Sequence, residues 1–395
     1  MKLFANLRRV AIMSIAMAGL AGCQLIPDTS GPDTSGPPVR DEPVVQQPSV
    51  PDANVLPNDG SHHRVALLVP LTGPDAAVGN SIANATTMAL LDTNATNIRI
   101  TSYDTALGAR SAARNAIADG NKLILGPLRA GNVSQVQAEA RSADVPVITY
   151  SNDASVAGPD VFVMGQVPSQ SIMRSVGYVR RRGAVNFAAI VPDDDYGREA
   201  QEALADAIAR SGGRLIATER YSSANTSIKS AALRLRQRGG FDTVLIADGA
   251  RLTAIAAEEL RPGGRGSLQL LGTERLSGEG SVTREPSLEG LLFSSISDAR
   301  FRRFSESYEE RFGGQPYRIA TLGYDSVLLT LRIARDWQVG EDFPKRRMRE
   351  DDGFLGLDGA FRFGSDNLIQ RAMEVREIRD GQVVIIDDAP QRFQD

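Results

Sequence analysis

The stretch that constrains the fold most is residues 65–81. Residues 65–69 are consecutive apolar residues, and residues 70–74 form a Pro/Thr/Gly turn ahead of a helix-prone run that begins at Ala76. A segment that is apolar throughout is typical of a strand buried on both faces, as in a parallel sheet. Ligands of open α/β sheets bind at the carboxyl ends of the strands, so this turn is the first candidate binding segment.

The same strand-turn-helix plan recurs along the chain. We predict further strands at residues 98–103, 122–125, 145–150, 161–164, 186–191, 214–221, 243–247, 268–271 and 291–295. We predict helices at residues 107–119, 132–143, 169–182, 198–210, 228–238, 252–260, 300–312 and 319–339. This alternation predicts parallel sheets with right-handed crossovers. Because the second half repeats the first, we expect an α/β protein with two similar doubly wound lobes.

The C-terminal part has a different pattern. The charged run 345–352 reads as a solvated loop. Residues 359–364, 370–378 and 383–386 alternate apolar with polar side chains, which predicts antiparallel strands. The turn at residues 379–381 joins the last two of them.

The N-terminus has the features of an export signal. Basic residues precede an apolar run at residues 10–20, which is too short to span a bilayer comfortably. Residues 20–23, Leu-Ala-Gly-Cys, resemble a lipobox, the motif in which the cysteine is lipidated and begins the mature protein. The resemblance implies a signal peptide at residues 1–22 and a lipid anchor on Cys23. The alternative is a simple secretory signal with a chance cysteine.

Gln24 follows the proposed anchor, where an Asp usually signals retention in the inner membrane. The lipobox resemblance therefore implies an outer-membrane lipid anchor with the folded domain in the periplasm. Residues 23–63 are rich in Pro, Ser and Gly and contain a tandem Pro-Asp-Thr-Ser-Gly copy, so we expect a disordered tether. His62 and His63 lack a third ligand nearby and read as spacer, with a metal site as the alternative.

Composition disfavours several classes of function. The net charge of −4 gives no nucleic-acid footprint. Cys23 is the only cysteine in the sequence, which excludes an intramolecular disulfide or a cysteine metal cluster. The two adjacent histidines leave none for a Ser-His-Asp site, and phosphate-loop, dinucleotide and nucleophile-elbow motifs are missing. We therefore expect no enzyme activity, no cofactor and no nucleic-acid partner.

Four motifs in order resemble the type I periplasmic binding proteins of the leucine/isoleucine/valine-binding kind. They are residues 69–73 (VPLTG), 125–128 (LGPL), 194–197 (DDYG) and 359–363 (GAFRF). The resemblance implies two lobes joined by three crossing segments, with a ligand in a cleft that closes by hinge motion. It assigns residues 64–166 plus 294–338 to lobe one and residues 167–293 plus 339–388 to lobe two.

Within that family, the lipobox, the tether and residues 66–73 most resemble the lipoprotein activators of class A penicillin-binding proteins. This implies an outer-membrane-anchored, non-catalytic activator of peptidoglycan synthesis with such a synthase as partner. Residues 23–64 are too few for the extra N-terminal helical-repeat domain of the best-known members. The alternative is the solute receptor of an ABC importer for an amino acid or a similar small polar ligand.

The resemblance also implies a set of cleft residues at the strand ends. On lobe one these are Thr72, Gly73, Pro127, Leu128, Arg129, Ser151 and Asn152. On lobe two they are Tyr196, Asp248 and Glu274. In amino-acid-binding relatives the lobe-one turns hold the ligand carboxylate, and an acid that Glu274 matches receives the ammonium. Arg129 departs from the usual small polar residue, and we expect it to bind an anion or to pair with Asp248 or Glu274.

Two charged runs have a structural interpretation beside a functional one. Residues 193–195, three aspartates in a strand-to-helix turn, favour a helix N-cap, with a metal site as the alternative. Residues 180–182, three arginines before Gly183, suit a helix C-terminus, with a patch for peptidoglycan or anionic lipid as the alternative.

Overall fold

The computed structural model describes residues 60–222, 227–264, 266–391 and 393. The expected signal peptide, the lipid attachment at Cys23 and nearly all of the expected tether lie outside the described residues. Within the described ranges, no helix combines the length and the apolar character that a membrane crossing requires.

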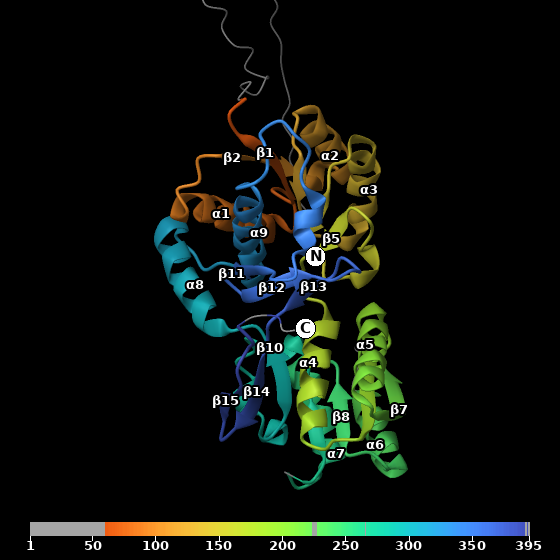
Figure 1. Cartoon of the computed structure of the whole chain (residues 1–395). Helices are drawn as coiled ribbons and strands as arrows, with labels where there is room; N and C mark the ends of the chain where they lie inside the picture. The colour runs from red at the N-terminus through yellow and green to blue at the C-terminus, as the bar shows by residue number, and fades with distance from the viewer. Residues whose placement is uncertain (1–59, 223–226, 265, 392, 394–395) are drawn as a thin grey trace, which may run out of the picture. The chain divides into compact units, whose positions relative to one another are not determined.

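The first sheet is built from five parallel strands in the order β2-β1-β3-β4-β5 (Figure 1). Its strands are β1 (His63–Val69), β2 (Ile98–Asp104), β3 (Leu123–Leu125), β4 (Val147–Thr149) and β5 (Val161–Val163). The helices α1 (Ala76–Asp92), α2 (Ala109–Ala118) and α3 (Ala130–Ala140) connect them. This order is one of the two common doubly wound arrangements, as the alternation of strands and helices predicted.

The second sheet has seven strands in the order β15-β14-β10-β9-β8-β6-β7. They are β6 (Asn186–Pro192), β7 (Arg214–Tyr221), β8 (Thr243–Ile246), β9 (Gln269–Leu271), β10 (Leu292–Ser295), β14 (Glu374–Arg379) and β15 (Gln382–Asp387). Its helices are α4 (Pro168–Arg181), α5 (Asp195–Ser211), α6 (Ser227–Arg238) and α7 (Ala250–Leu260). The strand β14 pairs antiparallel with β10 and with β15 at one edge of the sheet, and the other strand pairs of this sheet are parallel. The predicted fold class, two doubly wound α/β lobes, is confirmed.

The opening strand β1 is buried on both faces, as its uninterrupted apolar run predicted. Val65, Leu67 and Val69 pack into the core formed with α1 and with helix α9 (Thr321–Ile333). Ala66 and Leu68 point the other way, into the core formed with α2 and α3. Alternate residues of a strand face opposite sides of its sheet, so one short segment joins both cores of this lobe.

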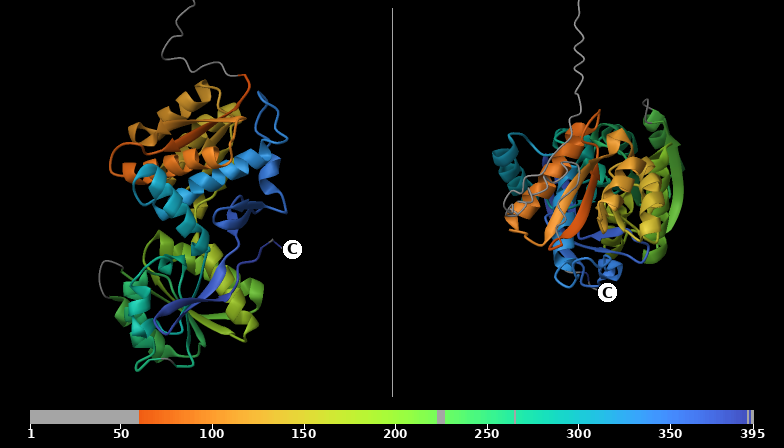
Figure 2. Two further views of the ribbon diagram at one scale, coloured as in Figure 1. Left: turned by 90° about the vertical axis from the view of Figure 1, so that its left-hand side faces the viewer. Right: turned by 90° about the horizontal axis from the view of Figure 1, so that it is seen from above.

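The C-terminal third adds elements to the first lobe before it returns to the second. After α8 (Asp298–Phe312) and α9 come three short strands, β11 (Phe354–Gly356), β12 (Gly359–Phe363) and β13 (Ile369–Arg371), which form a small separate sheet. Figure 2 shows this blue segment running from the small sheet into the second sheet. Phe354, Phe361 and Ile369 pack in the first lobe's core.

This arrangement differs from the expectation that residues 339–388 belong to lobe two. Residues 343–369 contribute to the lobe-one core, and the chain reaches the second sheet only at β14. Alternating apolar and polar residues indicate a strand, but they carry no information on which sheet the strand joins.

Two further boundaries differ from the predictions. The helix expected at residues 319–339 ends at Ile333, and Trp337 beyond it stacks on the ring of His63 with ring centroids 4.0 Å apart. His63, expected as spacer in the tether, is the first residue of β1 and only 3% exposed. The Trp337 ring covers His63, and a histidine in a linker would have no such contact.

The charged run 345–352 is partly structured. Residues 345–349 form a 3₁₀ helix in which Met348 is buried. The Lys345 ammonium pairs with Asp144 at 2.6 Å and with Asp160 at 2.8 Å. The predicted hairpin between β14 and β15 is present, and its turn residues Asp380 and Gly381 both have the positive φ that a tight hairpin turn requires.

Candidate ligand-binding cleft

A cavity of about 370 Å³ has walls from both lobes. Its lining residues are Leu128, Tyr150, Asn152, Gln166, Tyr196, Glu274, Arg275, Arg318, Ile319 and Leu322. The volume falls in the range of small-molecule sites, and the mixture of apolar surface with a few polar groups is typical of them. We refer to this space as the cleft cavity.

Four of the predicted cleft residues line this cavity: Leu128, Asn152, Tyr196 and Glu274. They follow or flank the carboxyl ends of β3, β4, β6 and β9. These four predicted residues and the cavity thus lie at the same edge of each sheet, the carboxyl ends of the strands.

The other lobe-one residues have partners outside the cleft cavity. The Thr72 hydroxyl donates to Asp104 Oδ2 at 2.6 Å, and Gly73 has the positive φ of a tight turn. Arg129 pairs with Asp75 of the same lobe, so the expected pairing with Asp248 or Glu274 is wrong. Asp75 lies in the turn after β1, so Arg129 finds its carboxylate partner within lobe one.

Pro127 and Ser151 are buried parts of the lobe-one framework. The Pro127 carbonyl accepts a hydrogen bond from the Thr149 hydroxyl at 2.7 Å. The Ser151 hydroxyl oxygen accepts from the Asp153 amide at 3.1 Å. On lobe two, Asp248 accepts hydrogen bonds from the Gly249 amide and the Tyr221 hydroxyl and does not line the cleft cavity.

Glu274 is held by hydroxyl groups of its own lobe. Its Oε2 accepts a hydrogen bond from the Ser171 hydroxyl at 2.7 Å, and its Oε1 lies 2.9 Å from the Tyr196 hydroxyl. Burial, and next the charge of Glu274, raise the pKa of Tyr196 well above its ordinary value of 10. The phenol therefore keeps its proton and remains available as a donor to the carboxylate.

Two arginines on the cavity wall were missed by the sequence reasoning. Arg275 lies over the Tyr196 ring, with its guanidinium carbon 3.4 Å from the ring centroid. Arg318 lies on the 3₁₀ turn ahead of α9, far from any strand end. Arg275 directly follows Glu274, a predicted cleft residue, so its position in the sequence could have indicated that it lies at the cavity. For Arg318 no strand-end pattern existed, because its position follows from how α9 packs.

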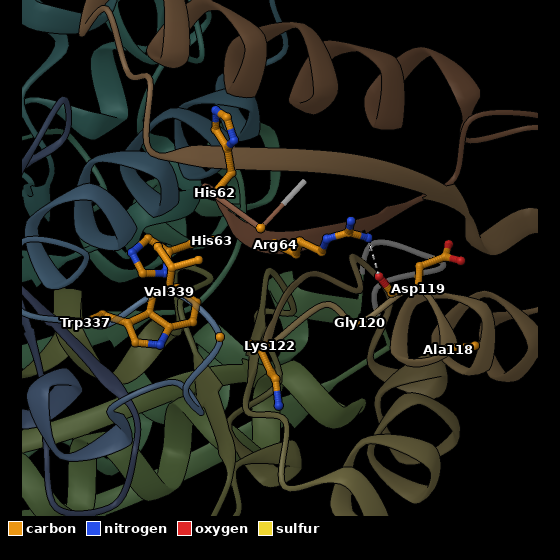
Figure 3. A pocket seen from close by; sticks show the side chains of 11 residues that line it. His62, His63, Arg64, Ala118, Asp119, Gly120, Lys122, Trp337 and Val339 are labelled. Atoms are coloured by element: carbon orange, nitrogen blue, oxygen red, sulfur yellow. Dashed lines mark hydrogen bonds between the residues drawn. The ribbon is translucent and has the colours of Figure 1, made fainter. Parts of the chain in front are cut away.

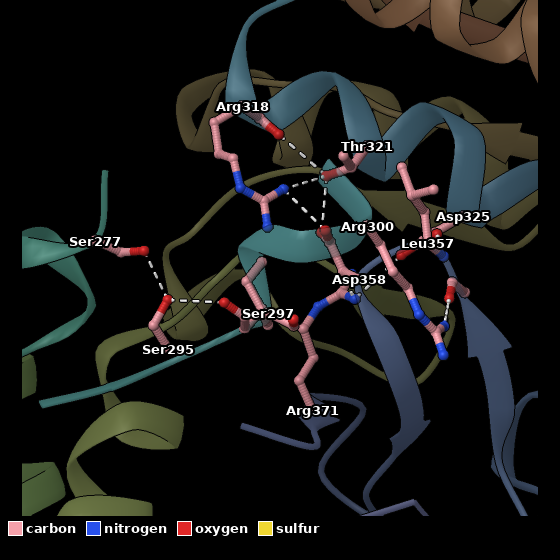
Figure 4. A network of polar contacts seen from close by, with 12 residues as sticks. Ser277, Ser295, Ser297, Arg300, Arg318, Thr321, Asp325, Leu357, Asp358 and Arg371 are labelled. Carbon is pink, nitrogen blue, oxygen red and sulfur yellow. Dashed lines mark hydrogen bonds and ion pairs between the residues drawn. The ribbon is translucent and has the colours of Figure 1, made fainter. Parts of the chain in front are cut away.

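Arg318 belongs to a network of charged groups at the base of lobe one (Figure 4). Its Nη1 donates to Asp358 Oδ1 at 2.8 Å and to the Thr321 hydroxyl at 3.1 Å. Arg371 lies 4.0 Å from Asp358 and 3.2 Å from Asp325. Burial, and next the neighbouring Asp358, raise the pKa of Asp325 above its ordinary value.

The aspartate run at residues 193–195 supports the helix-cap interpretation. The Asp194 side chain accepts a hydrogen bond from the Gly197 amide at 2.9 Å and caps α5. No cluster of three or more His, Cys, Asp or Glu side chains suited to a metal ion occurs in the part of the chain that the structure describes. At the end of α4, Arg180 donates to the carbonyls of Ser211 and Gly212, which fits the structural interpretation of residues 180–182.

A second cavity of about 420 Å³ lies at the amino end of β1 (Figure 3). Arg64 Nη1 there donates to the Asp119 carbonyl at 2.8 Å, and Lys122 pairs with Asp342 at 2.7 Å. Two cationic side chains of this cavity therefore already have partners within the lobe.

Comparisons with known proteins agree with this architecture. A family model described as periplasmic binding protein matches residues 63–382. The solved structure of a putative branched-chain amino acid ABC transporter from Rhodospirillum rubrum is 20% identical, with a TM-score of 0.72, and the match covers 82% of this chain and 100% of that one. Full-length LpoA from Haemophilus influenzae is 18% identical, with a TM-score of 0.66, over 83% of this chain and 59% of that one.

A curated relative is also known. An uncharacterized protein of Rickettsia prowazekii (strain Madrid E) is 29% identical over 169 residues, which is 42% of this chain and 45% of the relative. This chain thus spans less than half the length of that relative. The solved structures share the fold with this chain at low identity, whereas the family model covers most of its length. The chain belongs to the periplasmic binding protein family.

Proposed function

We propose that this protein is an outer-membrane lipoprotein whose periplasmic domain activates a class A penicillin-binding protein without catalysing a reaction itself. The observation that carries the proposal is that the groups expected to hold an amino acid are already bonded within the protein. Glu274 accepts hydroxyl hydrogen bonds, Thr72 bonds Asp104, and Arg129 pairs with Asp75. Because the groups that would bind an amino acid already bond other parts of the protein, we favour docking to a partner protein over delivery of a solute.

The N-terminal motif and the structural likeness support the same proposal. Cys23 lies where a lipobox places its lipidated cysteine, and Gln24 favours the outer membrane. Residues 23–63 have the Pro-, Ser- and Gly-rich composition of a spacer, which suits a domain that works at a distance from its anchor. The fold shared with LpoA of Haemophilus influenzae agrees with the sequence resemblance to the lipoprotein activators.

Periplasmic cross-linking followed by purification of the full-length lipoprotein tests this function. We expect recovery of a class A penicillin-binding protein, lost when the folded domain is deleted. Cys23→Ser is the matched variant for the anchor, and it should release the protein from the membrane fraction. Recovery of an importer permease without any synthase would contradict the proposal, and membrane retention of Cys23→Ser would contradict the anchor.

The second candidate function is a solute receptor for an ABC importer. It is favoured by the cleft cavity of about 370 Å³, whose lining comes from both lobes. The structural likeness to the Rhodospirillum rubrum ABC transporter protein agrees with it. Tight, saturable binding of a small solute together with recovery of a permease would select this function over the first.

A further inference from the structure

We propose that the free edge of β15 binds an extended strand of a partner protein, one with apolar side chains at alternate positions and basic residues at its two ends. This goes beyond the proposed function, which names a partner but no contact surface. It does not depend on that function, because a receptor that docks on a permease would have the same edge available.

The strand β15 forms one edge of the second sheet, where β14 is its neighbour among the described strands (Figure 1). Ile378 of β14 lies opposite Val383 of β15. The Ile378 amide donates to the Leu291 carbonyl at 3.0 Å and the Ile378 carbonyl accepts from the Gly290 amide at 2.7 Å, both on the side of β10. Ile378 and Val383 are therefore a pair without mutual hydrogen bonds, and the N–H and C=O of Val383 face the free edge.

Ile385 presents its backbone in the same direction as Val383, since the pattern of an antiparallel ladder repeats every second residue. Within the described ranges, the backbone hydrogen bonds of β15 go to β14 alone. The same two residues have the most exposed apolar side chains of the strand, 39% for Val383 and 48% for Ile385. They lie on one face, so an added strand would meet unpaired backbone groups and an apolar surface together.

The opposite edge of the same sheet, β7, is protected in a way that β15 is not. The strand β7 carries Arg214, Glu219 and Arg220, whereas β15 has no charged residue before Asp387. Charged side chains on an edge strand oppose pairing with other chains, and an edge without them is a template for strand addition. The contrast between the two edges therefore indicates β15 as the surface that accepts another strand.

Carboxylates at both ends of β15 determine the charge of the partner strand. Asp380 in the hairpin turn and Asp388 directly after the strand are exposed and form no ion pair within the described residues. The nearby Arg379 pairs with Glu377, and two arginines of α4 pair with Asp387. A strand with a basic residue at each end would therefore place an opposite charge beside each free carboxylate.

A second copy of this chain fits the edge less well. Antiparallel pairing of two β15 strands would satisfy the outward backbone groups with Val383 opposite Ile385 of the other copy. That register places Asp380 opposite Asp388 at both ends of the pair. Like charges directly opposite each other destabilise a strand pair, so the charges favour a different protein chain over self-association.

Fluorescence anisotropy with the detergent-solubilised full-length lipoprotein tests the proposal. The probes are two labelled, end-capped peptides, KTVTVTK and ETVTVTE, which share an alternating apolar strand and differ only in the charge of their ends. We expect KTVTVTK to bind at least about tenfold more tightly, since both of its ends lie beside carboxylates. Asp380→Asn combined with Asp388→Asn should bring the two affinities to within about threefold of each other.

Two single variants test the edge itself. Val383→Pro removes an N–H that β14 does not use, so it should weaken KTVTVTK binding by about tenfold or more while the sheet remains folded. Ile385→Lys places a charge on the edge and should have a similar effect. Val185→Lys is its matched control, because it adds the same charge at a 38% exposed apolar residue beside β6, on the far side of the sheet, and should leave binding unchanged.

The proposal is overturned if KTVTVTK does not bind at millimolar concentration, if ETVTVTE binds as tightly, or if Val383→Pro and Ile385→Lys both keep full affinity. Sedimentation of the lipoprotein alone in detergent should show a monomer. A dimer that Ile385→Lys abolishes would assign the edge to a second copy and overturn the proposal as well. Recovery of a synthase by cross-linking is a separate measurement, so either proposal can fail without the other.

Discussion

Two groups of charges in the first lobe and its cleft differ in how they are paired. At the base of lobe one, the side chains of Arg371, Asp325 and Asp358 are fully buried, with Arg371 between the two carboxylates. At the cleft cavity, Arg318 has one carboxylate partner and Arg275 has none within the described residues. The two groups share Asp358, which bonds Arg318 and lies 4.0 Å from Arg371, but only Arg318 and Arg275 line a space large enough for a ligand.

The difference separates charges that maintain the fold from charges that are available to a ligand. Each charge of a fully buried ion pair is compensated only by its partner. Removal of one partner leaves an uncompensated buried charge and so lowers the free energy of unfolding. A partly exposed arginine keeps some hydration, so its loss affects stability less and ligand affinity more.

The largest effect is expected for Arg371→Met. This change leaves Asp325 and Asp358 buried without their shared cation, and breaking a buried pair in this way costs about 3–5 kcal/mol. Urea unfolding of the full-length chain measures the loss. A decrease below about 1 kcal/mol would show that this cluster does not stabilise the fold and would remove the contrast with the cleft.

Arg318→Gln should cost less, about 1–2 kcal/mol in the same urea experiment. Asp358 keeps a 2.7 Å hydrogen bond from the Thr321 hydroxyl and the nearby charge of Arg371. The free energy of unfolding is therefore expected to fall between that of the wild type and that of Arg371→Met. A loss as large as that of Arg371→Met would place Arg318 in the structural group instead.

Glu199 lines a cavity of about 740 Å³ that shares Asn152 and Tyr196 with the cleft cavity. We expect its titration to make the free energy of unfolding depend on pH. Its pKa is raised from 4.5 to about 7 by burial, by Asp153 and then by Glu274 and Glu202. The folded state therefore binds more protons than the unfolded state between these values, so stability falls as pH rises from about 4.5 through about 7. After discounting for partial exposure we expect a loss of about 1 kcal/mol.

Chemical unfolding at a series of pH values measures this slope. Glu199→Gln should flatten it, because the amide mimics the protonated acid at every pH, and Glu202→Gln is the control, since Glu202 contributes least to the shift among these acids. An unchanged slope in Glu199→Gln would contradict the assignment of the pH dependence to this residue.

The smallest effect is expected for Arg129→Ala. The Arg129 side chain is 63% exposed, and exposed ion pairs contribute between about 0 and 1 kcal/mol. Thermal unfolding should show a shift close to the error of the method. A strong destabilisation would mean that the Asp75 contact organises the turn after β1 more than its exposure indicates.

Most of the fold was predictable, because local patterns determined it. The apolar run of β1 indicated a strand buried on both faces, and Val65 and Ala66 do face different cores. Asp380 and Gly381 marked the last hairpin correctly. The lobe to which residues 343–369 belong was not predictable in this way, since it depends on tertiary packing of side chains such as Phe361.

The cleft was predictable in part for the same reason. Strand ends indicated Leu128, Asn152, Tyr196 and Glu274 as residues near the cavity. Arg129 lies at a strand end as well, but a carboxylate in the turn after β1 pairs with it. Arg318 comes from the start of a packed helix, which no local pattern connects with the cavity. Sequence patterns thus located the edge of the sheets, and tertiary contacts decided which side chains reach the cavity.

The central claim, that this domain is a non-catalytic activator, is tested most directly by the glycan polymerisation rate of class A penicillin-binding proteins from the same organism. The rate is measured with and without the full-length lipoprotein in the same detergent or membrane. We expect a higher rate with the lipoprotein, and no reaction when the synthase is omitted. An unchanged rate for every class A synthase of the organism, with no complex formed, would contradict it.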